Sequence, residues 1–156
     1  MKFAGKEFKD YWKIIKMPTY VLVAWGILSF IIATISFSLY TTIFSPLAGW
    51  ILTIAVFGFI GWTAIKDHKQ TIKISAWSGA LAGAISGFVG AIIGILMFYF
   101  VPDILFAAAA QAGVDPTAIQ GFMAIGVYIG LITGPLISGL IGALISVIAA
   151  LIAKKI

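Results

Sequence analysis

The chain has 156 residues, of which 62% are hydrophobic and only 10% charged, with ten lysines, no arginine and five acidic residues. Soluble domains are about half apolar and about a quarter charged, so this composition excludes a water-soluble globular protein and predicts an integral membrane protein. The absence of cysteine excludes disulfides, thiolate metal sites and cysteine nucleophiles.

Three long stretches of the chain contain no charged residue and no histidine. A hydrocarbon core about 30 Å thick requires about 20 apolar residues per helix, and the first stretch is long enough for two crossings. Each crossing has to be helical, because lipid offers backbone groups no hydrogen-bond partner. We therefore predict an all-α, multi-pass protein, with an N-terminal amphipathic interfacial helix over residues 1–17 and a four-span bundle over residues 18–156. The predicted transmembrane helices cover residues 20–40, 47–65, 74–101 and 121–153.

The first 17 residues have the pattern of an amphipathic helix. Phe8, Tyr11 and Ile15 recur at helical spacing on one face, and lysines recur at steps of three and four on another. Such a helix lies in the membrane interface, and we expect Met17–Pro18 to end it. A topology anchor is the preferred interpretation, and a docking site or a sensor of lipid charge is the alternative. The predicted lipid-headgroup contacts are Lys2, Lys6, Lys9, Trp12, Lys13 and Lys16.

The lysines also predict the orientation in the membrane. In a four-span arrangement all ten lie on one side, whereas the loop over residues 102–120 carries only Asp103 and Asp115. By the positive-inside rule, both termini and the loop over residues 66–73 are expected in the cytoplasm, in a protein of the plasma membrane. The expected partners of the lysines are anionic lipid headgroups rather than nucleic acid.

The first two predicted spans are rich in large apolar side chains. Phe30, Phe37, Phe57 and Phe59 indicate helices that face lipid. Pro46 suits the first turn of the second span, where its missing N–H costs nothing.

The third and fourth predicted spans contain rows of glycine, the pattern of a GxxxG motif or glycine zipper. A four-residue step places each glycine almost above the last, which forms a groove where another helix backbone can lie close. Packing of these two spans on each other is the preferred interpretation, while oligomerisation and a glycine-lined pore remain alternatives. Leucine at Gly83 or Gly130 is expected to disrupt packing far more than Phe57→Leu. The predicted helix-packing residues are Gly79, Gly83, Gly87, Gly90, Gly94, Gly126, Gly130, Gly134, Gly139 and Gly142.

Pro135 lies inside the fourth span and predicts a kink, because proline removes a backbone hydrogen bond and clashes with the preceding turn. A structural kink is preferred over a gating hinge. A short interfacial helix is expected over residues 104–112, and Asp115–Pro116 is typical of a helix start.

No predicted span contains a group that could act as a base. The lone histidine, His68, lies in a charged loop, and the serines of the spans are expected to bond to their own helix. We therefore expect no catalytic residue, no metal site, no cofactor and no enzymatic activity.

These expectations favour a non-catalytic accessory or structural subunit, or an assembly factor, of a membrane complex. Its partners would be the lipid bilayer and other membrane subunits, or further copies of itself. A small homo-oligomeric channel or uncoupled permease for a small solute is one alternative, and a membrane-shaping or lipid-binding protein is another.

Overall fold

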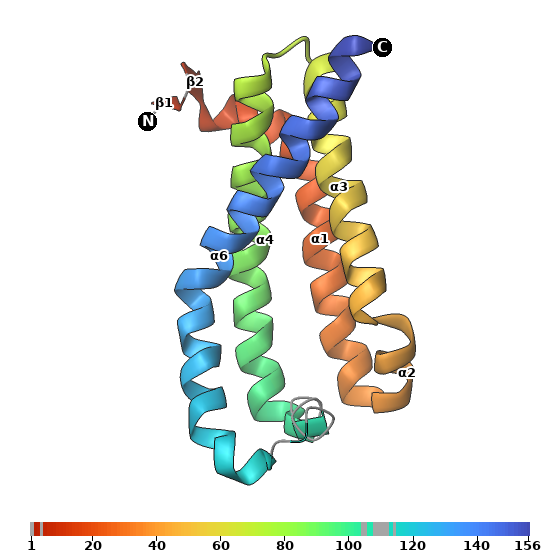
Figure 1. Cartoon of the computed structure of the whole chain (residues 1–156), viewed down its shortest axis with the longest axis vertical. Coiled ribbons are helices and arrows are strands. Elements are labelled where there is room, and N and C mark those ends of the chain that lie inside the picture. Colours follow the sequence, from red (N-terminus) through yellow and green to blue (C-terminus); the bar gives the residue numbers. More distant parts are fainter. Residues whose placement is uncertain (1, 4, 104–105, 108–112, 114) are drawn as a thin grey trace.

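Figure 1 shows the computed structural model, which describes the chain apart from residues 1, 4, 104–105, 108–112 and 114. Four of its helices are long and apolar enough to cross a membrane, which confirms the prediction of an all-helical, four-span protein. Most of the predicted helix over residues 104–112 lies outside the described residues. The described elements are strands β1 (Lys2–Phe3) and β2 (Lys6–Glu7) and helices α1 (Phe8–Ile35), α2 (Phe37–Ile43), α3 (Pro46–Lys66), α4 (Ile72–Phe100) and α6 (Pro116–Lys155).

The N-terminal helix does not end at Met17–Pro18, so that prediction is wrong. Helix α1 continues without a break through Pro18, and the side chain of Pro18 is buried. Figure 1 shows the first part of α1 crossing one end of the bundle before the helix turns along the other spans. Proline tolerates this position because tertiary packing of the flanking turns offsets the lost backbone hydrogen bond. The helix begins with a capping box in which the Glu7 N–H donates to Asp10 Oδ2 at 3.3 Å.

The connections between helices follow ordinary capping chemistry. The Ser45 hydroxyl accepts the Ala48 N–H at 3.3 Å, and Pro46 occupies the first turn of α3, as its sequence position predicts. Thr71 caps α4 in the same way, through the Ile74 N–H at 3.4 Å. Helix α6 begins at Pro116, as the Asp115–Pro116 pattern predicts, and thus extends beyond the transmembrane range predicted for residues 121–153.

All ten lysines gather at one end of the bundle, which we call the lysine end. Figure 1 places both termini and the loop between α3 and α4 there, and these segments hold residues 2–16, 66–73 and 154–155. The opposite end, which we call the distal end, contains α2, the end of α4 and the start of α6. The four-span arrangement therefore segregates positive charge as the sequence predicts, and the assignment of the lysine end to the cytoplasm stays a prediction.

Helix α4 packs most extensively on α6, while α3 packs mainly on α6 and α1 packs mainly on α4. Helices α3 and α6 separate towards the distal end (Figure 1), whereas α1 and α4 stay in contact there through a second apolar cluster. The main core cluster lies towards the lysine end and joins Tyr11 and Ile15 of α1 to Ile60 and Ala64 of α3 and to Ile74 of α4. Tyr11 and Ile15 have no exposed surface, so this part of the amphipathic segment packs on protein rather than on lipid.

The burial of Phe57 contradicts the prediction for this residue. It was expected to face lipid, but only 2% of its surface is exposed, and it belongs to the main core cluster. Phe59 and Phe37 do lie outward, with 57% and 43% of their surfaces exposed. Hydrophobicity alone cannot separate these cases, because a lipid-facing phenylalanine and a buried one satisfy the same apolar requirement.

Candidate functional site

Glycines bring the backbones of α4 and α6 together along a line that we call the glycine seam. It pairs Gly79 with Gly142, Gly83 with Ser138 and Gly87 with Gly134, so the two helices run antiparallel. A Cβ atom built on Gly87 would lie 2.6 Å from the Gly134 carbonyl oxygen, which leaves no room for a side chain. The predicted glycines at the seam are Gly79, Gly83, Gly87, Gly134, Gly139 and Gly142.

The remaining predicted packing glycines make no close contact with another helix among the described residues. At Gly90, Gly94, Gly126 and Gly130, an added Cβ would meet no atom of another described element within 4 Å. These four glycines lie on the distal side of the Gly87–Gly134 contact. Figure 1 shows that α6 changes direction near its middle, and Pro135, which lies there, interrupts the backbone hydrogen bonds of the helix. Within one chain, leucine is therefore expected to disrupt helix packing at Gly83 but not at Gly130.

Two close contacts involve glycines that were not predicted. A Cβ on Gly61 of α3 would meet the Ser146 carbonyl and would lie 2.9 Å from the Ala149 Cβ, so Gly61 sets the approach of α3 to α6. A Cβ on Gly26 of α1 would lie 2.8 Å from Cδ1 of Ile93. The spacing of Gly58, Gly61 and Ala64 at steps of three was the available signal for the first contact.

Two serines join three helices beside the seam. The Ser75 hydroxyl of α4 donates to the Ser146 carbonyl at 3.0 Å, and the Ser146 hydroxyl of α6 donates to the Phe57 carbonyl of α3 at 2.9 Å. Both serines are fully buried. Ser29 and Ser86 bond within their own helices as expected, but Ser146 does not, because a close neighbouring carbonyl is available to it.

Ser146→Ala is expected to lower the free energy of unfolding by about 1 kcal/mol, because it leaves the Phe57 carbonyl without its interhelical donor. Denaturation with sodium dodecyl sulfate in mixed micelles, followed by circular dichroism, measures this change. Ser29→Ala is the matched control, since the Ser29 hydroxyl reaches only the Gly26 carbonyl of its own helix. A loss for Ser146→Ala no larger than that for Ser29→Ala would contradict the interhelical role.

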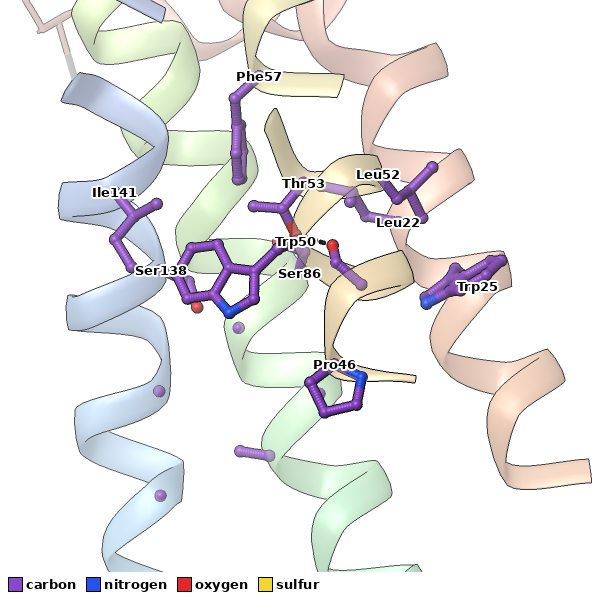
Figure 2. A pocket seen from close by; sticks show the side chains of 16 residues that line it. Leu22, Trp25, Pro46, Trp50, Leu52, Thr53, Phe57, Ser86, Ser138 and Ile141 are labelled. Carbon is purple, nitrogen blue, oxygen red and sulfur yellow. Dashed lines mark hydrogen bonds between the residues drawn. The ribbon is translucent and has the colours of Figure 1, made fainter. Parts of the chain in front are cut away.

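An open cleft, lined by residues of all four spans, lies where α3 and α6 separate and has a volume of about 560 Å³. Figure 2 shows side chains of all four spans around it, and the Trp50 ring of α3 points into it. One wall, on α4 and α6, consists of small residues except for Ile141. The opposite wall, on α1 and α3, is aromatic and aliphatic. The lining of the cleft includes Trp25, Trp50, Gly90, Ala91, Gly130 and Ser138.

The side-chain polar groups of the cleft are three hydroxyls and the indole N–H groups of Trp25 and Trp50, and two of the hydroxyls are hydrogen-bonded. Thr53 donates to the Gly49 carbonyl at 2.8 Å and Ser86 to the Gly83 carbonyl at 3.2 Å. Ser138 has no hydrogen-bond partner among the residues that the structure describes. No charged side chain lines this cleft. The arrangement suits apolar contact with one or two hydrogen bonds.

The predicted headgroup residues lie on the outer surface of the lysine end. Lys9, Lys13 and Lys16 are exposed, and Lys6 and Trp12 are partly buried; the side chain of Lys2 lies outside the described set. The Trp12 ring stacks on Phe8 and meets Tyr20 edge-on, both at centroid distances of 5.9 Å. Aromatic rings that cluster beside lysines are typical of a membrane–water boundary.

Within the described part of the chain, no three His, Cys, Asp or Glu side chains lie together as they would around a metal ion. No protein-family model, no curated protein and no solved structure matches this chain.

Proposed function

We propose that this multi-pass membrane protein is a non-catalytic accessory subunit, and that the cleft between α3 and α6 receives a transmembrane helix of a partner subunit. The observation that carries the proposal is a small-residue wall left uncovered inside the bilayer region. Gly90 and Gly130 have open space beside them, although glycines of the same two helices are tightly packed along the seam.

The cleft has complementary walls for such a helix. Glycine on one wall allows a close backbone approach, which favours helix association through dispersion and Cα–H···O contacts. Trp25 and Trp50 on the other wall offer large, rigid surfaces that can pack on the partner's side chains. The cleft opens beside surfaces that face lipid, so a helix already in the membrane can enter it from the side.

The chemistry of the cleft supports binding rather than catalysis. Its lining provides neither an acid–base pair nor a charged group, and its one hydroxyl without a described partner, Ser138, has no base beside it. A hydroxyl in this position can instead donate to a backbone carbonyl of an incoming helix. Such bonds contribute about 0.6 kcal/mol on average in membranes.

A photo-crosslinking side chain at Ala91, on the wall of the cleft, is expected to join the chain to one discrete polypeptide in the native membrane. The same label at Phe59, which faces outward on α3 and lies outside the cleft, is expected to react with lipid. The bulky variant Gly130→Phe should reduce the polypeptide adduct about tenfold or more by filling the cleft. Gly126→Phe provides the matched control, because Gly126 also has open space but does not line the cleft.

Two outcomes contradict the proposal. One is the formation of lipid adducts alone from both labelled positions. The other is equal loss of the adduct in the Gly130→Phe and Gly126→Phe variants. Flux of a small neutral solute through liposomes that contain this chain alone, blocked by Gly130→Phe, would favour a channel or uncoupled permease.

A further inference from the structure

A second cavity, which we call the basic pocket, lies at the lysine end and encloses about 280 Å³. It forms where the first part of α1 packs beside the loop between α3 and α4. Lys6 of β2 and Lys13 of α1 lie on one side of it, and His68 and Gln70 of the loop lie on the other. Tyr11, Ile14 and Ile74 form its apolar floor, and all three are buried. The pocket is thus built on the core cluster rather than on a free tail.

Most polar side chains of the basic pocket are hydrogen-bond donors that can still donate to a ligand. Neither Lys6 nor Lys13 forms an ion pair within the described part of the chain. The acidic member of the pocket, Asp10, is engaged through the Glu7 N–H at 3.3 Å. Gln70 donates one side-chain N–H to the His68 carbonyl at 2.7 Å, which holds the loop side in place and leaves a second N–H for a ligand.

Two adjacent elements bring the lysines of the basic pocket together. Asp10 and Lys13 lie three residues apart on one side of the start of α1, and Lys6 lies in β2, directly before that helix. Lys9 and Lys16 do not line the basic pocket. The two lysines outweigh Asp10, so the pocket has a net positive charge at a defined point, where a compact anion fits.

We propose that the basic pocket binds the phosphate group of one anionic phospholipid headgroup, independently of what occupies the cleft. Lys6 and Lys13 supply charge-assisted hydrogen bonds to the phosphate oxygens, and Gln70 and His68 supply further donors from the loop. A lipid rather than a free phosphate is the source, because Phe8, Trp12 and Tyr20 cluster on the same part of α1 and mark the level of the headgroups.

Native mass spectrometry of the full-length protein in a non-ionic detergent tests this proposal, with phosphatidylglycerol titrated against phosphatidylcholine. Wild type is expected to retain one phosphatidylglycerol more tightly than the rest. The double variant Lys6→Gln/Lys13→Gln should weaken this binding about tenfold or more. The control double variant Lys9→Gln/Lys16→Gln removes the same net charge from the same segment without touching the pocket, and should weaken it only a few-fold.

Two further measurements make the result decisive. His68→Leu changes the loop side alone and should weaken binding several-fold while the lysines remain, so a folding defect in the first variant would not end the test. Inorganic phosphate should not displace the lipid when both are present at the same concentration. Equal losses of phosphatidylglycerol binding in the two double variants would show that diffuse surface charge binds the lipid and that the pocket does not. Displacement by inorganic phosphate would identify a soluble anion instead of a lipid. Either result overturns the proposal.

Discussion

Gly83→Leu is expected to lower the free energy of unfolding by about 3 kcal/mol, the upper part of the usual range for overpacking a closely packed site. Any Cβ atom at this position meets the carbonyl group of Ser138 and also lies 2.9 Å from the Cα of Gly139. Both obstacles are backbone atoms of α6, which cannot rotate away as a flexible side chain would. The seam must therefore open along several residues to admit the leucine.

Denaturation of the purified protein with sodium dodecyl sulfate in mixed micelles measures this loss, and Gly126→Leu is the control. Gly126 lies on a seam helix but has open space around it, so leucine there should change stability by no more than about 1 kcal/mol, in the stabilising direction given the helix preference of leucine. A loss for Gly126→Leu as large as that for Gly83→Leu would remove the argument that close backbone approach stabilises α4 against α6.

Gly61→Leu is expected to cost about 3 kcal/mol as well, but through a different contact. A Cβ at Gly61 meets the carbonyl of Ser146, and this carbonyl already accepts the hydroxyl of Ser75. The substitution therefore pushes α3 away from α6 at the point where three helices are hydrogen-bonded together. Since the Ser146 hydroxyl donates to the Phe57 carbonyl one turn away, the displacement also weakens that bond.

The displacement in Gly61→Leu can be measured directly, because the chain has no native cysteine to interfere with labelling. Spin labels at the outward positions Phe59 of α3 and Leu144 of α6 should report a longer distance than in the parent protein. Gly58→Leu, three residues earlier on α3, has open space and should leave both stability and distance close to the parent values. Identical behaviour of the two variants would show that α3 and α6 do not depend on the glycine contact.

The number of spans was predictable, because the cost of placing charge in lipid acts on every residue and needs no tertiary information. The limits of the first span were not, since α1 ends at Ile35 rather than at residue 40. The glycine rows were predictable only in part. Four-residue spacing identifies a helix face that can pack, but it does not predict along how many turns the neighbouring helix stays in contact with that face. The change in direction of α6 near Pro135 decides this, and it separates Gly134, which packs, from Gly130, which does not.

The candidate sites were less accessible from the sequence than the fold. The cleft combines residues of four helices, and its aromatic wall has the same composition as a lipid-facing surface, so neither Trp25 nor Trp50 was distinguishable in advance. The sequence predicted that the N-terminal helix ends at Pro18, whereas the segment that lines the basic pocket belongs to a helix that continues through Pro18. Core packing of Tyr11 and Ile15 outweighed the local penalty of proline, and such tertiary gains have no local signature.

Towards the distal end α3 and α6 separate (Figure 1), while α1 and α4 stay packed on each other. The bundle therefore remains joined on one side of the opening. A helix that entered between α3 and α6 would not have to pull the four spans apart, so it could be exchanged while the rest of the fold stays intact.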